Sequence, residues 1–159
     1  MHVSEFILSA YKGLIVIINK IDILENREEE EKKLLNYLHY KMNFVSWAPV
    51  IFISAQKNIH IKNILPIAKK IAEERKKRLS PNQLNAFLRA TLAAHPPSKG
   101  GRKITFFSVV QREVSPPIFR FLVSREDLVH FSYRRFLENE LRRMYGFEGT
   151  AIRLEFWDK

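Results

Sequence analysis

The stretch Gly13-Leu-Ile-Val-Ile-Ile-Asn-Lys-Ile-Asp22 decides the fold expected for the first half of the chain. Its aliphatic run, residues 14–18, has the length of a strand, and such a run is typical of a strand buried on both faces of a parallel α/β sheet. The run stops abruptly at Asn19-Lys20-Ile21-Asp22. Because open α/β sheets bind ligands at the carboxyl ends of their strands, we expect a binding loop here.

The side chains of this loop carry the groups that a guanine base requires. The Asp22 carboxylate can accept two parallel hydrogen bonds from N1–H and the exocyclic amine of guanine, a pattern that adenine does not offer. The Asn19 amide can contact the imidazole edge of the base or brace the loop, and the stem of Lys20 can lie over the flat ring. A surface turn without a ligand is the alternative interpretation of so short a motif.

A second β-rich run, residues 48–53, ends in Ser54-Ala55 and is separated from the first by a charged segment of helical pattern. Two parallel strands joined by a crossover helix place both following loops at the same edge of the sheet. In that geometry the Ala55 backbone N–H could donate to guanine O6. The two motifs together resemble the base-recognition half of a GTPase G domain.

Composition sets the broad class of the protein. The 159 residues suffice for one ordinary domain or two small ones, and the absence of cysteine excludes disulfides and thiolate metal sites. No apolar run approaches membrane-spanning length and the first twelve residues do not resemble a signal peptide, so we expect a cytoplasmic protein without a membrane partner. The net charge of +10 favours a polyanionic partner such as RNA, although solubility alone can explain a basic protein.

We place a domain boundary at Leu79-Ser80-Pro81-Asn82, which gives domains over 1–78 and 79–159. Ser80 can cap a helix whose first residue is Pro81. Lysines outnumber arginines 11 to 3 before the boundary, and arginines outnumber lysines 10 to 3 after it. Because the planar guanidinium suits phosphates and stacks on bases, this bias indicates that the second half faces RNA.

The pattern of the second half predicts the order α-β-β-α-β, the general shape of KH-like RNA modules. The only GxxG motif, Gly146-Phe-Glu-Gly149, follows the long helix, so we expect a turn there rather than the usual RNA clamp. The predicted helices of the whole chain cover residues 3–11, 28–42, 61–78, 81–94 and 126–145, and the predicted strands cover 14–18, 50–53, 102–111, 118–123 and 152–156.

Several longer segments resemble one family in the same order along the chain. They are Lys12–Asp22, Phe52–Ala55, Leu84-Asn85, His95–Pro97, Gln111, Pro116–Phe119, Leu128–Tyr133, Arg135–Asn139, Leu141-Arg142 and Gly146–Ile152. The chain resembles the C-terminal part of the Der family, also called EngA, which are bacterial GTPases of ribosome assembly. The resemblance implies a partial G domain with a parallel α/β sheet, followed by an α+β KH-like domain that docks on the G domains and helps engage the large ribosomal subunit and its rRNA.

By the same resemblance the chain would bind GTP or GDP. Asn19, Lys20 and Asp22 would read the guanine, with Ser54 and Ala55 in support. The family places two G domains before the KH-like one, so we expect this chain to begin partway through the second. It contains no G-x-x-x-x-G-K-[ST] loop and no Asp-x-x-Gly segment, so we expect no catalytic or metal-binding residue, Mg²⁺ only with the preceding half, and no GTP hydrolysis by the chain alone.

Two functions remain open from the sequence. The first is the C-terminal portion of a GTP-binding protein of large-subunit biogenesis, whose residues facing RNA or the ribosome are Arg102, Lys103, Arg134, Arg135, Arg142 and Arg143. A solvated helix face paired with Glu138 and Glu140 is the alternative interpretation of these arginines. The second is a non-enzymatic KH-like interaction domain that docks on G domains or on rRNA.

Overall fold

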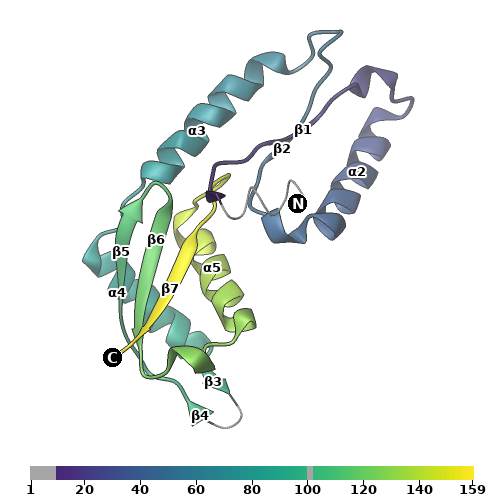
Figure 1. Ribbon diagram of the computed structural model, residues 1–159. Coiled ribbons are helices and arrows are strands. Elements are labelled where there is room, and N and C mark those ends of the chain that lie inside the picture. Colours follow the sequence, from purple (N-terminus) through teal and green to yellow (C-terminus); the bar gives the residue numbers. More distant parts are fainter. Residues whose placement is uncertain (1–9, 100–101) are drawn as a thin grey trace. The chain divides into compact units, whose positions relative to one another are not determined.

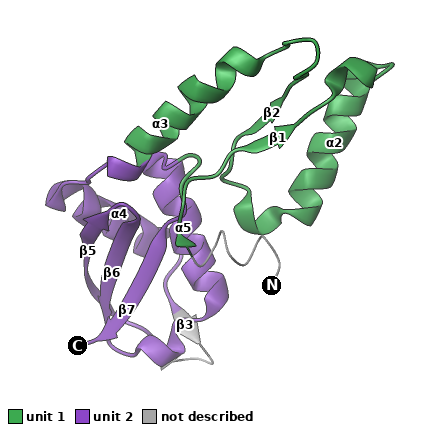
Figure 2. Ribbon diagram, turned by 45° about the horizontal axis from the view of Figure 1, so that its top comes forward, with its two compact units in different colours: residues 1–74, 148–150 green, residues 75–147, 151–159 purple. Residues whose placement is uncertain are grey.

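The computed structural model describes residues 10–99 and 102–159, and the chain forms two compact units (Figure 2). The first unit comprises residues 1–74 and 148–150, and the second comprises residues 75–147 and 151–159. The helix predicted over residues 3–11 lies outside the described residues, apart from its last two positions.

The first unit is built on two parallel strands, β1 (Val16–Ile18) and β2 (Val50–Phe52), which confirms the predicted pairing. The register runs from Val16↔Val50 to Ile18↔Phe52. The segment between the strands contains η1 (Ile21–Ile23), α2 (Arg27–Lys41) and η2 (Asn43–Val45), and β2 is followed by η3 (Ile61–Asn63) and α3 (Ile64–Lys76) (Figure 1).

Burial in the first unit is uneven. Ile21, Val45, Ile51, Ile53 and Ile71 are each at most 8% exposed and form its apolar centre. Ile17 of β1 is 44% exposed, so the prediction that this strand is buried on both faces is wrong. The reason is that β1 pairs only with β2 in the part of the chain that the structure describes.

Residues 148–150 complete the first unit although they follow helix α5 (Phe131–Tyr145) in the sequence. The Leu14 N–H donates to the Gly149 carbonyl at 2.8 Å, and the Gly149 N–H donates to the Trp47 carbonyl at 2.8 Å. The predicted turn is confirmed, and Gly149 adopts a φ of +69°. A Cβ at Gly149 would overlap the Ile71 side chain, so both the backbone angle and the space require glycine.

The second unit contains the predicted α-β-β-α-β order as α4 (Pro81–Ala94), β5 (Phe106–Val114), β6 (Pro117–Val123), α5 and β7 (Arg153–Asp158), with two short strands added between α4 and β5. This order confirms the α+β fold class. Strands β5, β6 and β7 form one sheet in that order, antiparallel between β5 and β6 and parallel between β6 and β7. Figure 1 shows α4 and α5 on the same side of this sheet. The remaining elements are the short strands β3 (Ser98–Lys99) and β4 (Arg102–Lys103) and the 3₁₀ helix η4 (Glu126–Leu128).

Local sequence explains where α4 begins. Ser80 is its N-cap, Pro81 is its first residue, and the Ser80 and Gln83 side chains form a reciprocal capping box. The strand predicted over 102–111 is instead divided into β4 and β5. At the division the Ile104 side chain is buried, and the Ile104 N–H donates to the Pro97 carbonyl at 3.1 Å.

Candidate functional site

The loops that follow β1 and β2 meet at one edge of the parallel sheet, as the crossover geometry predicts. The Ile53 N–H donates to the Ile18 carbonyl at 2.8 Å, and the Ile21 N–H donates to the Ile53 carbonyl at 3.1 Å. Strand pairing therefore continues past the ends of both strands. This continuation brings the Asn-Lys-Ile-Asp loop beside Ser54 and Ala55.

Asn19 ties the two loops together. Its Oδ1 accepts hydrogen bonds from the Lys20 N–H at 2.8 Å and from the Ala55 N–H at 3.1 Å. Of the two roles considered for Asn19, the structure therefore shows the bracing one. The Ala55 N–H, expected to face a guanine O6, is directed to Asn19 in this structure.

Lys20 turns the chain between the strand and the short helix that carries Asp22. It has a φ of 69° and a ψ of 36°, in the left-handed region, and it is exposed. This turn directs Ile21 into the apolar centre, where it is 2% exposed, and leaves Asp22 half-buried at the sheet edge. An apolar residue at position 21 therefore anchors the loop.

The Asp22 carboxylate is ionised, and one of its two oxygens lacks a hydrogen-bond donor among the described residues. A hydrogen bond from the Ser54 side chain lowers the pKa of Asp22; burial opposes this shift, and Lys57 and Lys20 add to it. The carboxylate is therefore charged at neutral pH. Its Oδ1 atom is buried and has no hydrogen-bond partner in the described part of the chain. A buried acceptor left unpaired costs free energy, and a donor from a ligand would remove that cost.

The loop after β2 is held by its own contacts. Ser54 is fully buried, and its Oγ accepts from the Lys57 N–H at 3.0 Å. Ser54 and Ile59 form an antiparallel bridge, and the chain turns between them with Asn58 at a φ of 56°. His60, which the sequence did not single out, follows at a φ of 57° with its Nδ1 3.0 Å from the Phe52 carbonyl.

Three of the arginines proposed from the sequence to face RNA are engaged by their own unit. The Arg142 side chain is 14% exposed, bonds Glu138 at 2.7 Å and donates to the Phe147 carbonyl at 2.7 Å. Arg143 pairs with Glu140, and Arg134 donates to the Val129 carbonyl. Burial lowers the pKa of Arg142 despite its partner Glu138. Arg142 therefore serves the packing of α5.

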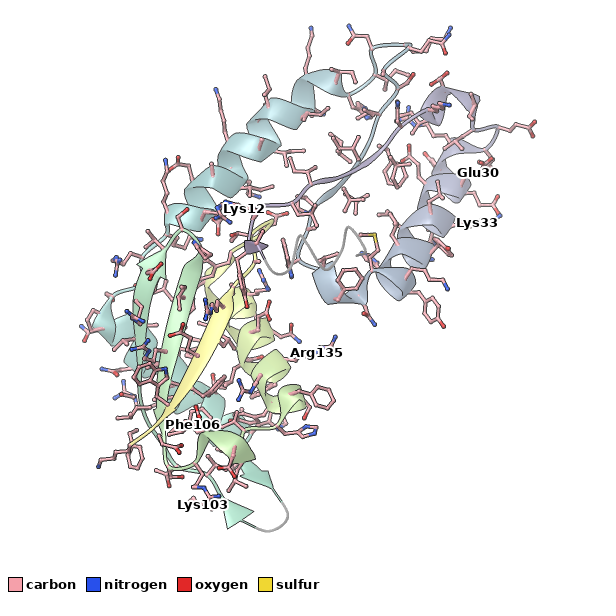
Figure 3. All side chains as sticks on the ribbon, viewed as in Figure 1. Lys12, Glu30, Lys33, Lys103, Phe106 and Arg135 are labelled. Atoms are coloured by element: carbon pink, nitrogen blue, oxygen red, sulfur yellow. The ribbon has the colours of Figure 1, made fainter. Side chains whose placement is uncertain are left out.

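The other candidates differ from these three. Arg135 is exposed and has no hydrogen bond or ion pair with any described residue, and Figure 3 shows it on the side of α5 away from the sheet. Lys103, in β4, is likewise exposed. Arg102 has a described backbone in β4 but no described side chain. Of the candidates with a described side chain, Arg135 and Lys103 are therefore the most available for binding a phosphate of another molecule.

The described part of the chain contains no group of three or more His, Cys, Asp or Glu side chains arranged to hold a metal ion. A search of the same residues for a helix both long and apolar enough to cross a membrane finds none.

Comparison with known families identifies the second unit. Residues 78–157 match the family model described as KH-domain-like of EngA bacterial GTPase enzymes, C-terminal. The match spans half of the chain, so the chain belongs to this family, and the predicted resemblance is confirmed.

Curated relatives extend the similarity over both units. The chain is 39% identical to GTPase Der from Thermomicrobium roseum over 156 residues, which is 96% of this chain and 34% of that protein. It is 39% identical to GTPase Der from Symbiobacterium thermophilum over 91% of this chain and 31% of that protein. The chain therefore spans about a third of the length of the curated relatives it matches.

Among solved structures, the chain is similar to Era in complex with MgGDPNP and nucleotides 1506–1542 of 16S ribosomal RNA. The identity is 17%, the TM-score is 0.35, and the alignment covers 98% of this chain and 58% of Era. A likeness of this degree supports no argument about the site.

Proposed function

We propose that this chain is the guanine-recognition and KH-like portion of a Der-type GTP-binding protein that acts in the cytoplasm in biogenesis of the large ribosomal subunit. The observation that carries the nucleotide half of the proposal is the Asp22 carboxylate. A hydrogen bond from Ser54 lowers the pKa of this carboxyl, and one of its oxygens is buried without a donor in the described part of the chain. Relatives named GTPase Der support the same assignment.

A guanine base fits the chemistry of this loop. Its N1–H and exocyclic amine are adjacent donors, which a carboxylate can accept together. In the proposal Asp22 accepts both, Asn19 and Ser54 hold the loops, Lys20 lies over the ring and the Ala55 N–H turns to O6. Because Asp22 Oδ1 is covered in this structure, the loop has to shift when the base enters.

The proposal concerns GTP and GDP binding and assigns no hydrolysis to the chain. The sequence contains no phosphate-binding loop of the G-x-x-x-x-G-K-[ST] type, which supplies a lysine and a hydroxyl for Mg²⁺ in phosphoryl transfer. Mg²⁺ would therefore be held by other parts of a longer protein, whose G domains are also proposed partners of the KH-like unit.

The RNA half of the proposal rests on charge and fold. The chain carries a net charge of +10, and the family assigned to its second unit is KH-like. We place rRNA of the large subunit as the partner, with Arg135 and Lys103 as cations that meet phosphate. Arg142, Arg143 and Arg134 act mainly within their own unit, since each already has an acceptor there.

An exchange of base preference tests the guanine site. Asp22→Asn replaces an acceptor by an amide that can donate, and xanthine carries a carbonyl where guanine carries its amine. We expect the affinity for guanosine to fall by about tenfold or more, because a hydrogen bond to a charged group is lost, and the affinity for xanthosine to rise. The measurement is a titration of the isotopically labelled chain with each nucleoside, followed by NMR.

Asp127→Asn is the matched control, because Asp127 is an exposed carboxylate of the second unit that pairs with Arg125. It should leave both affinities unchanged. Equal binding of guanosine and xanthosine by the original chain and by Asp22→Asn would remove Asp22 from the site.

A further inference from the structure

The face of the β5-β6-β7 sheet opposite the helices carries an unusual set of side chains. The register places Val110, Arg120 and Glu155 in one row across the three strands, and Ser108, Leu122 and Trp157 in the next. The alternate row of Val109, Phe121 and Phe156 is buried in the core. We call the surface formed by Val110, Arg112, Arg120, Leu122, Glu155 and Trp157 the open face.

The open face has an excess of arginine around a single carboxylate. Arg120 bonds Glu155 through two nitrogens at 3.1 and 2.9 Å, Arg112 lies 3.9 Å from Glu155, and Arg153 lies 3.4 Å from it. Arg120 and Arg112 share the Glu155 carboxylate, so these three side chains together carry a charge of +1. The Glu155 side chain is 16% exposed and orients the arginines, and the Arg112 side chain is 45% exposed.

Exposed apolar and aromatic surface lies beside these charges. Trp157 is 52% exposed and Val110 is 51% exposed, although both side chains are largely apolar. The Arg120 guanidinium carbon lies 3.8 Å from the centroid of the Trp157 ring, which fixes the ring against the sheet. A hollow of about 320 Å³ adjoins Trp157 and is lined by Glu126, Trp157 and Asp158.

The GxxG segment, which in usual KH domains clamps the nucleic-acid backbone, makes contacts within the first unit of this protein. Within the only GxxG segment, Glu148 pairs with Lys70, and the Gly149 carbonyl and N–H bond Leu14 and Trp47. A clamp needs these groups for the nucleic-acid backbone. RNA bound by the second unit therefore requires a different surface.

We propose that the open face binds single-stranded RNA, with one unstacked base packed against Trp157 in the adjoining hollow and the arginine cluster meeting the phosphates. Bases stack on aromatic rings and on guanidinium planes, and arginine forks suit phosphate. Guanidinium forks beside an exposed indole ring favour a nucleic acid, which offers both phosphates and bases, over a neutral apolar partner. This inference rests on the proposed RNA partner and adds a second contact surface, on the other side of the sheet from Arg135 (Figure 1, Figure 3).

The test measures binding of the full chain to a mixed-sequence single-stranded oligoribonucleotide of about 12 nucleotides, within the usual range for such sites. Trp157→Ala should weaken binding by about tenfold, since loss of one base–aromatic stack has an effect of this size. Trp157→Tyr keeps an aromatic ring and should retain most of the affinity. Tyr40→Ala removes a 77% exposed ring from α2 and should change nothing.

Two further readouts separate stacking from a change in folding. With Trp47→Phe as background, the fluorescence of Trp157 should be quenched as RNA is added. Arg112→Gln should reduce the slope of log affinity against log salt by about one, whereas Arg27→Gln, which removes a paired arginine of α2, should leave it unchanged.

The possible results distinguish this inference from the function on which it rests. If the original chain binds no RNA under any salt condition, both the RNA half of the proposed function and this inference fail. If the original chain binds RNA but Trp157→Ala binds equally well and no quenching occurs, the inference alone is overturned. The inference would also be overturned if Trp157→Ala abolished binding of this chain to a folded protein partner but left its affinity for RNA unchanged.

Discussion

Phe121→Ala is expected to lower the free energy of unfolding of the second unit by about 3–5 kcal/mol, the usual effect of removing a buried phenylalanine ring. Phe121 is fully buried in the middle strand of the sheet. Its ring stacks on Phe156 at a centroid distance of 5.2 Å and meets Phe106 at 5.9 Å and Phe87 at 6.4 Å. Removal of the ring therefore opens a cavity at the junction of α4 and the three strands.

The effect is measured by urea denaturation followed by circular dichroism. Phe131→Ala provides the control, because Phe131 is 64% exposed at the start of α5, and its loss should change stability by less than about 0.5 kcal/mol. If both variants lost the same small amount of stability, the core described for the second unit would be incorrect.

Gly149→Ala is expected to destabilise the first unit by about 2–4 kcal/mol. A Cβ at this position meets the Ile71 side chain, and the φ of +69° is costly for any residue with a Cβ. Ile71 is 5% exposed and therefore has little room to move. The loss should be visible as a lower urea midpoint of the first unit.

Gly13→Ala is the matched variant for this measurement. Gly13 bridges Thr150 in the same unit but does not have a positive φ, so alanine should be tolerated there. Equal stability of the two variants would contradict the placement of residues 148–150 against Ile71.

The sequence correctly predicted those elements of the fold that are determined by residues close together in the chain. Ser80, Pro81 and Gln83 form a complete helix-start signal, and α4 begins there. The aliphatic run that ends at Asn19 likewise predicted a strand, and the second run predicted its parallel neighbour. Family resemblance, carried by the longer motifs of the second half, is confirmed by the match over residues 78–157.

The parts that the sequence did not predict depend on register and on distant contacts. The arginine cluster of the open face requires Arg120 to lie opposite Glu155, which depends on the pairing of β6 with β7. Position along α5 suggested an outward Arg142, but the side chain turns to Glu138 and to the Phe147 carbonyl. Membership of residues 148–150 in the first unit depends on hydrogen bonds to Leu14 and Trp47, far away in the sequence.

The proposed guanine site was predictable only in part. Its motifs were visible in the sequence, and the structure brings their loops to one sheet edge. Guanine binding by Asp22 stays a prediction, because the contact that carries it has to form with a ligand. The orientation of the Ala55 N–H toward Asn19 could not be foreseen from spacing alone.

The measurement that tests the proposed function most directly is co-sedimentation of the chain with purified large and small ribosomal subunits across a range of salt concentrations. We expect retention by the large subunit that falls as salt rises, because lysine and arginine contacts to phosphate release counterions. In the double variant Lys103→Gln, Arg135→Gln the slope of this salt dependence should fall by about two, whereas Lys33→Gln on α2 should leave it unchanged. Equal retention by both subunits would contradict the proposal. Binding only to isolated G domains, with an affinity that does not change with salt concentration, would also contradict it and would favour a domain that docks on G domains.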